Sequence, residues 1–249
     1  MTVEQRAADG VLIDLDGTLV RGGRPVPGSP ELIRSLGRRA IVVSNNSSHT
    51  PADLSEQLSR LVIDISPPCL LLAGDVALRT LRREYADAAV LLCANEAMTE
   101  HAAAMGIQLV LGEGRPDIVL LTRDDTFTYK KLCRAVDAVR SGARLVAANP
   151  DLTHPGLEGR VVPETGALLQ SLLACPGVEV HLTIGKPEPF LLLEGARRLG
   201  RPISACVMVG DNPATDGVGA KRLGMRCLLV DPGVPGFNLY NAVLDWTTR

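Results

Sequence analysis

The stretch Ile13-Asp14-Leu15-Asp16-Gly17-Thr18-Leu19 decides how this chain is interpreted. The apolar run from Val11 to Ile13 predicts a buried parallel strand. Asp14 and Asp16 follow at its carboxyl end, where open α/β sheets place their ligands. Two carboxylates on one face of a strand repel each other unless a cation or a shared proton relieves them. Oxygen ligands at this spacing suit Mg²⁺, which leaves positions for substrate phosphate. The alternative is purely structural: an aspartate at the end of the strand caps a turn, and Asp16-Gly17 are ordinary turn residues.

Length, composition and charge limit the classes of protein to which this chain can belong. The chain has 249 residues, enough for one large domain or two modest ones, with 46% hydrophobic and 22% charged residues. A net charge of −2 and a pI near 6.1 argue against a nucleic-acid partner. No apolar run approaches the roughly 18 residues of a membrane span, so no membrane partner is expected. The N-terminal segment does not resemble a signal peptide.

The six cysteines are dispersed along the chain without a C-x-x-C pair. This pattern predicts reduced, buried thiols that pack as small hydrophobic groups, and it offers no zinc site. A cytoplasmic location is therefore expected.

Apolar runs alternate with helical patterns, as in βαβ units built around a parallel sheet. Nine strands are predicted: Val11–Leu15, Ala40–Ser44, Cys69–Ala73, Ala89–Cys93, Asp117–Thr122, Arg144–Ala148, His181–Ile184, Ala205–Gly210 and Arg226–Val230. Three helices stand out by their apolar stripes: one opened by Thr50-Pro51, one over Tyr129–Val139 and one over Phe190–Leu199. The sequence thus predicts an α/β fold.

Three further polar clusters each follow a predicted strand, and parallel strands bring such clusters to one sheet edge. Ser44 to Ser48 offers a hydroxyl and successive amides for phosphate oxygens. Lys186, between Gly185 and Pro187, supplies a fixed positive charge. Gly210 to Asp216 adds two further carboxylates, Asp211 and Asp216. Each cluster alone also fits an ordinary polar loop.

The four clusters in this order, D-x-D-G-T, S-N-N, G-K-P and G-D-x-x-x-T-D, resemble the haloacid dehalogenase (HAD) superfamily of aspartyl-nucleophile phosphotransferases. The resemblance covers nearly the whole chain. It is narrowed to the NagD and p-nitrophenyl phosphatase branch by three middle segments: Asp124–Leu132, Asn149–Asp151 and Pro163–Ala167. The resemblance implies a Rossmann-like core from residues 1–73 and 179–249, and an inserted α/β cap of the C2 type, residues 74–178.

The same resemblance implies roles for the acidic residues. Asp14 would be the nucleophile that forms an aspartyl-phosphate. Asp16 would protonate the leaving group and then activate the hydrolytic water. Mg²⁺ would be held by the Asp14 carboxylate, the Asp16 backbone carbonyl and Asp211, and Asp216 would orient these ligands.

The phosphate of the substrate would be bound by other groups of the same motifs. Ser44 and Lys186 would bind its oxygens, and Lys186 would offset the repulsion between the nucleophile and an anionic substrate. Asn45 and the backbone amides of Leu15 and Asp16 would complete the cradle. The implied partner is a small phosphorylated metabolite.

The cap residues bear on the identity of that metabolite. His154, Glu158 and Arg160 lie where this branch places residues that reach the leaving group of its substrates, and Arg160 could pair with a second anionic group. Two features depart from the family pattern, namely Glu164, where a glycine is usual, and Ala94-Asn95-Glu96. Sugar phosphates, glycerol phosphate, phosphoglycolate, nucleoside monophosphates and pyridoxal phosphate all remain open.

Two other functions compete with a phosphatase. A haloacid dehalogenase also uses the first aspartate as nucleophile, but dehalogenases of this superfamily lack the second acid, which is Asp16 here. A catalytically silent binding module would be expected to have lost Asp14, Lys186 or Asp211, and all three are present. The sequence leaves the choice between a monomer and a homodimer open.

Overall fold

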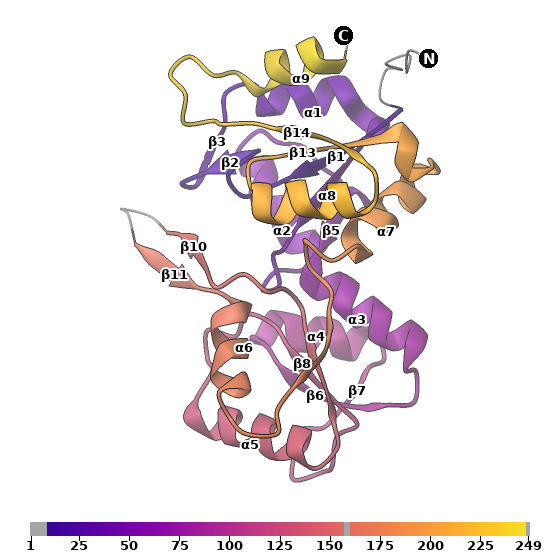
Figure 1. Cartoon of the computed structure of the whole chain (residues 1–249), viewed down its shortest axis with the longest axis vertical. Coiled ribbons are helices and arrows are strands. Elements are labelled where there is room, and N and C mark those ends of the chain that lie inside the picture. The colour runs from indigo at the N-terminus through magenta and orange to yellow at the C-terminus, as the bar shows by residue number, and fades with distance from the viewer. Residues whose placement is uncertain (1–8, 157–159, 248–249) are drawn as a thin grey trace. The chain divides into compact units, whose positions relative to one another are not determined.

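The chain folds into two compact units in a computed structural model that describes residues 9–156 and 160–247. The first unit comprises the chain up to Ser44, Pro51–Leu71 and the chain from Lys186 onward. The second comprises Asn45–Thr50 and Leu72–Gly185. Both units are therefore assembled from segments that are not continuous in sequence (Figure 1).

A five-stranded sheet forms the centre of the first unit, in the order β14-β13-β1-β4-β5. Its strands are β1 (Gly10–Asp14), β4 (Ala40–Ser44), β5 (Leu70–Leu72), β13 (Cys206–Gly210) and β14 (Arg226–Leu229). The central strand β1 pairs in parallel with β13 and β4, with Ile13 opposite both Val209 and Val42. This register brings the carboxyl ends of the three strands, and the polar residues that follow them, to one edge of the sheet.

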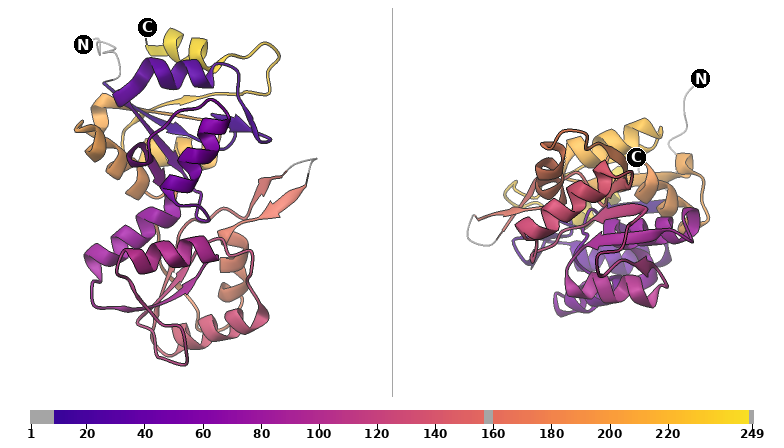
Figure 2. Two further views of the ribbon diagram at one scale, coloured as in Figure 1. Left: turned by 180° about the vertical axis from the view of Figure 1, so that it is seen from behind. Right: turned by 90° about the horizontal axis from the view of Figure 1, so that it is seen from below.

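Helices cover both faces of this sheet. They are α1 (Ser29–Leu36), α2 (Pro51–Arg60), α7 (Phe190–Leu199), α8 (Val218–Arg222) and α9 (Leu239–Thr247). Figures 1 and 2 show α1 and α9 together on one side of the sheet and α7 and α8 on the other. A two-residue hairpin pair, β2 (Val20–Arg21) and β3 (Arg24–Pro25), follows the acidic motif.

The second unit has its own five-stranded sheet, in the order β12-β9-β8-β6-β7. Its strands are β6 (Ala89–Cys93), β7 (Gln108–Leu109), β8 (Ile118–Leu121), β9 (Arg144–Ala147) and β12 (Val180–Thr183). The strand β12 lies beyond Val178, the predicted end of the cap, but it pairs in parallel with β9 and therefore belongs to this second sheet. An apolar run identifies a strand but does not state which sheet it joins.

The helices of the second unit are α3 (Ala73–Glu84), α4 (Glu96–Ala104), α5 (Tyr129–Arg140) and α6 (Thr165–Leu173). The helices α5 and α6 enclose one apolar cluster with the sheet, which includes Val119, Leu145, Val136 and Leu172. An antiparallel hairpin, β10 (Thr153–Pro155) with β11 (Val161–Pro163), projects from this unit.

Each of the nine predicted strands has a counterpart in the structure. The strands β2, β3, β7, β10 and β11 were not predicted, because two or three residues are too few to show an alternating pattern. All six cysteines are free thiols, but only Cys93 and Cys206 are buried; the prediction that all six are buried is wrong for the other four, which are partly exposed. Within residues 9–156 and 160–247, no helix is both long and apolar enough to cross a membrane.

Candidate active site

The D-x-D motif presents its two acids very differently. Asp14 is the last residue of β1 and only 6% exposed, whereas Asp16 is exposed to solvent. Leu15, between them, is buried in the core. Gly17 follows with a φ of +94°, a backbone conformation that favours glycine. A Cβ atom at this position would also collide with the carboxylate of Asp211, so Gly17 lets the loop after β1 approach the loop after β13.

Thr18 joins these two loops through its hydroxyl. Its Oγ1 lies 3.2 Å from Asp14 Oδ2 and 3.2 Å from Asp211 Oδ1. The side chain is fully buried, so the hydroxyl helps to hold the two carboxylates in a fixed arrangement. Thr18 belongs to the D-x-D-G-T motif, but the motif alone predicts no role for this residue.

Lys186 lies on the other side of Asp14. The residue is only 2% exposed, and its ammonium group donates to Asp14 Oδ1, to Asp216 Oδ1 at 2.7 Å and to the carbonyl oxygen of Val43 at 3.3 Å. The second oxygen of Asp216 accepts from the backbone N–H of Asn212 at 3.2 Å. Both oxygens of Asp216 are therefore engaged, and the residue fixes Lys186 in place.

Asp216 itself is held by one turn of π-helix, Pro213–Gly217, directly after the loop that carries Asp211. Single π-helical turns are rare and occur frequently at functional sites. Both acids of the G-D-x-x-x-T-D motif thus come from the segment that follows β13.

The residues of the S-N-N segment are divided between the two units. Ser44 ends β4 and its hydroxyl donates to Asp16 Oδ2 at 3.3 Å. The next residue, Asn45, belongs to the second unit, and its side-chain amide donates to Asp151 Oδ2 at 3.0 Å. In this structure the Asn45 amide is therefore engaged by another residue of its own unit.

Negative charges outnumber positive ones in the site. Three carboxylates, those of Asp14, Asp211 and Asp216, lie near the ammonium group of Lys186, and the charge of Asp16 also acts on Asp14. Burial raises the pKa of Asp14 well above its usual range; Lys186 opposes this shift and Asp216 adds to it. Burial and the charge of Asp216 also raise the pKa of Asp211. Burial alone would lower the pKa of Lys186, but Asp14 and Asp216 outweigh it and hold that pKa above its ordinary value.

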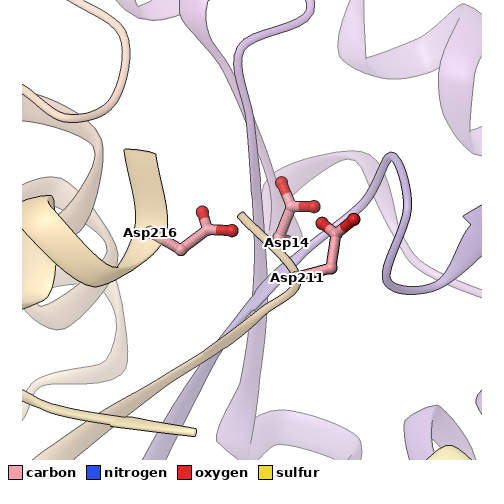
Figure 3. A group of neighbouring side chains, drawn as sticks. All are labelled: Asp14, Asp211 and Asp216. Carbon is pink, nitrogen blue, oxygen red and sulfur yellow. The ribbon is translucent and has the colours of Figure 1, made fainter. Parts of the chain in front are cut away.

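This excess of negative charge favours binding of a cation. Carboxylate oxygens of Asp14, Asp211 and Asp216 lie within 4.8 Å of one another. Figure 3 shows Asp14 and Asp211 side by side, with Asp216 directed toward them from its own helix. Both oxygens of Asp216 accept hydrogen bonds, from Lys186 and from the Asn212 N–H, whereas Asp14 Oδ2 and Asp211 Oδ1 share one donor, the Thr18 hydroxyl. Asp14 and Asp211 are therefore the side chains better placed to hold a metal ion. Hard oxygen donors of this kind fit Mg²⁺ or Ca²⁺.

The predicted specificity residues lie in the hairpin of the second unit. His154 Nδ1 lies 2.7 Å from Glu164 Oε1, and the guanidinium group of Arg123 lies 3.1 Å from the same oxygen. Glu164, which departs from the family pattern, thus contacts both His154 and Arg123, and no motif in the sequence pointed to Arg123. Arg160 is exposed. Glu158 lies outside the described residues.

The second departure from the family pattern has a structural role in this chain. The side chain of Asn95 accepts from the N–H of Met98 at 3.0 Å and so caps the start of α4. Its amide also donates to the carbonyl oxygen of Ser48 at 2.8 Å.

Two family models match the chain. The first, for haloacid dehalogenase-like hydrolases, matches residues 11–108, and a second, HAD-hydrolase-like model matches residues 183–237. Together they include all four motifs of the site. The 5′-nucleotidase YutF of Bacillus subtilis is 32% identical over 228 residues, which span 90% of this chain and 88% of YutF. The chain belongs to the haloacid dehalogenase-like hydrolases.

Named members of this family with similar sequences are phosphatases. A dihydroxyacetone phosphatase of Corynebacterium glutamicum is 28% identical over 90% of this chain and 81% of its own length. Among solved structures, the glycerol phosphate phosphatase Rv1692 of Mycobacterium tuberculosis, in complex with magnesium, gives a TM-score of 0.83 at 31% identity. That match covers 92% of this chain and 69% of the other. The family and these relatives make the chain a phosphoric monoester hydrolase, with a divalent metal ion as cofactor.

Proposed function

We propose that this HAD-family phosphatase hydrolyses a small phosphomonoester with Mg²⁺ through a covalent aspartyl-phosphate on Asp14. One observation carries the proposal: a buried carboxylate contacts a buried ammonium group, while a second carboxylate two residues away is exposed. The buried acid is suited to attack an electrophile, and the exposed acid is suited to exchange protons with water.

The reaction has two steps. In the first, a carboxylate oxygen of Asp14 forms a bond to the phosphorus, and the bond from phosphorus to the leaving oxygen breaks. Asp16 gives its proton to that oxygen, so the alcohol leaves neutral. In the second step Asp16 takes a proton from water as the water attacks the same phosphorus. Inorganic phosphate departs and Asp14 is regenerated.

The metal ion would be held by the Asp14 carboxylate, the backbone carbonyl of Asp16 and the Asp211 carboxylate. When bound, it supplies positive charge that lets a carboxylate and a phosphate dianion approach each other. Mg²⁺ should serve better than Ca²⁺, because calcium takes more ligands at longer distances. Calcium could then engage both oxygens of Asp14 and leave no uncoordinated oxygen for the attack.

Ser44 and Lys186 would bind the phosphate oxygens, together with the backbone amides of Leu15 and Asp16. Lys186 is anchored by Asp216 as well as Asp14, so a phosphoryl group could share its ammonium group without loss of both anchors. Asn45 would contribute through its backbone, since its side chain is bonded to Asp151.

The second unit would act as the cap that selects the substrate, with His154 and Arg160 as its specificity residues. The relatives named above act on nucleotides, dihydroxyacetone phosphate and glycerol phosphate, which supports a small phosphorylated metabolite as substrate. The six free thiols support a cytoplasmic location for the protein.

A turnover screen tests the proposal. Purified protein is assayed for phosphate release from p-nitrophenyl phosphate and a panel of phosphorylated metabolites, with Mg²⁺, with Ca²⁺ and with EDTA. We expect release with Mg²⁺ and a clear preference within the panel. Acid quench of a single turnover with ³²P-labelled substrate should trap label on the wild type but not on Asp14→Asn. Halide release from haloacids without any phosphate release would identify a dehalogenase instead.

A second experiment tests the cap assignment. Arg160→Ala and His154→Ala should change the ratios of kcat/KM among natural phosphates by about ten- to a hundred-fold, as expected for loss of a desolvated charged contact. Hydrolysis of p-nitrophenyl phosphate should change less, because its apolar leaving group needs no anionic partner. An equal loss on every substrate would show that the hairpin is only structural.

A further inference from the structure

The chain passes between its two units at four places, and two of them adjoin the phosphate-binding residues. One crossing lies between Ser44 and Asn45, and another between Gly185 and Lys186. The other two follow Thr50 and Leu71. Ser44 and Lys186, whose side chains would bind phosphate, are therefore each joined by one peptide bond to a residue of the second unit.

Asn149, two residues after β9, lies at the centre of a buried hydrogen-bond network in the second unit. Its side chain is completely buried. The side-chain amide donates to the carbonyl oxygen of Asn45 at 2.7 Å, and it also lies 3.2 Å from Ser47 Oγ and 3.1 Å from Thr165 Oγ1. Its Oδ1 accepts from the N–H of Asp151 at 3.1 Å. Asn149 thus holds the backbone directly after Ser44.

The same part of the second unit also holds the backbone directly before Lys186. The N–H of Gly185 donates to the carbonyl oxygen of Ala148 at 2.8 Å. A Cβ atom on Gly185 would lie 2.6 Å from Asn45 Oδ1 and 2.7 Å from Asn149 Cβ. Both distances are too short for real contacts, so only glycine lets this segment pack directly against Asn45 and Asn149.

Two hydroxyl groups, those of Ser47 and Thr165, complete the hydrogen-bond network around Asn149. Ser47 Oγ and Thr165 Oγ1 lie 2.8 Å apart, and the N–H of Arg123 donates to Ser47 Oγ at 2.9 Å. Both hydroxyl residues are buried. A buried network whose members are hydrogen-bonded to one another is rigid, so Asn149 offers a fixed anchor to both crossings.

We propose that Asn149 is a positioning residue for the phosphatase reaction, which ties together the segments flanking Ser44 and Lys186 and so sets the spacing of the two phosphate-binding groups. The proposal rests on the function proposed above, in which these two groups bind phosphate. Asn149 itself touches neither the substrate nor the reacting atoms in this scheme.

Two variants disturb the crossings and one matched variant does not. Asn149→Asp keeps the size of the side chain but replaces the donor that faces the Asn45 carbonyl with an acceptor. Gly185→Ala introduces the Cβ that would press on Asn45 and Asn149. Thr165→Val removes a hydroxyl of the same network at similar volume but leaves Asn149 its hydrogen bonds to Asn45, Ser47 and Asp151, so both crossings should stay held.

The measurements are KM and kcat for the best substrate, the inhibition constant of inorganic phosphate, and the melting temperature. All three variants should lower the melting temperature. Asn149→Asp and Gly185→Ala should raise both KM and the phosphate inhibition constant about tenfold, whereas Thr165→Val should leave both within twofold of the wild type. A merely structural defect lowers stability and the active fraction without changing affinity for phosphate.

The proposal fails if Gly185→Ala, or a folded Asn149→Asp, binds phosphate as tightly as the wild type. It also fails if Thr165→Val weakens phosphate binding as much as they do. These outcomes are distinct from failure of the proposed function, which would show first as a wild-type protein without phosphatase activity.

Discussion

Replacement of Asp14 by asparagine should abolish turnover without destabilising the fold. An amide cannot form the acyl-phosphate, so kcat should fall by more than about 1,000-fold, as is usual when a nucleophile is removed. The effect on stability follows from two opposing terms. The variant loses a charged hydrogen bond from Lys186, which is worth about 1.5–3 kcal/mol. It also avoids burying an ionised carboxylate, which costs several kcal/mol in a protein interior.

The balance of these two terms predicts that the variant is at least as stable as the wild type. Burial and Asp216 raise the pKa of Asp14 despite Lys186, which means that the folded protein disfavours the charged form of this residue. Lys186 retains Asp216 as its partner at 2.7 Å. We therefore expect metal-free Asp14→Asn to unfold with a free energy between that of the wild type and about 2 kcal/mol above it. For a chain of this length, 1 kcal/mol corresponds to about 2–4 °C in melting temperature.

Melting is followed by circular dichroism in EDTA, and turnover by p-nitrophenol release with Mg²⁺. Asp16→Asn is the matched control, because it removes an exposed carboxylate two residues away: it should also lose activity but gain no stability. Residual activity of Asp14→Asn above about 1% of wild type would refute the nucleophile assignment. A fall in melting temperature of more than about 5 °C would show that the contact with Lys186 outweighs the cost of burial.

Three further predictions concern the metal, the backbone and pH. Mg²⁺ should raise the melting temperature of the wild type, and Asp211→Asn should abolish this rise in differential scanning fluorimetry. Val62, 60% exposed at a φ of +61°, is a β-branched residue in the left-handed region, so Val62→Gly should raise the unfolding free energy in urea by about 1 kcal/mol, and an unchanged value would contradict the strain. Hydrogen bonds from Arg197 and Arg198 lower the pKa of Glu194 from 4.5 to about 2, so its stabilisation, about 1 kcal/mol after allowance for solvent, is present above pH 4.5. Relative to Glu194→Gln, the wild type should lose this advantage as the pH falls from 4.5 toward 2, whereas a constant difference in melting temperature would refute the pairing.

The sequence predicted local features of the site better than long-range ones. Asp14 and Asp16 could be placed at the end of β1 because the apolar run and the acids are adjacent in the chain. The contact between Lys186 and Asp14, 172 positions apart, followed only from resemblance to a family. Strand pairing is likewise a long-range property, so the apolar pattern over residues 181–184 predicted a strand but not its place beside β9.

Other features left too weak a signal in the sequence. The S-N-N segment reads as one loop, yet Ser44 and Asn45 belong to different units, since the hydrogen-bond partners of Asn45 come from residues about a hundred positions later. The positive φ of Val62 also contradicts the preference of its side chain, and such a conformation is set by the path of the loop between α2 and β5.

The strand order of the first sheet has a consequence for synthesis of the protein. The strand β1 ends at Asp14, but one of its two neighbours in the sheet, β13, begins only at Cys206 and is therefore synthesised much later. The second sheet, over residues 89–183, is complete before then. Since domains generally fold as units during synthesis, the nascent chain should carry a β1 that can pair with β4 but has one unpaired edge until β13 is made. Asp211 and Asp216 follow β13 directly, so a growing chain cannot assemble the three-carboxylate cluster before this neighbour of β1 is made.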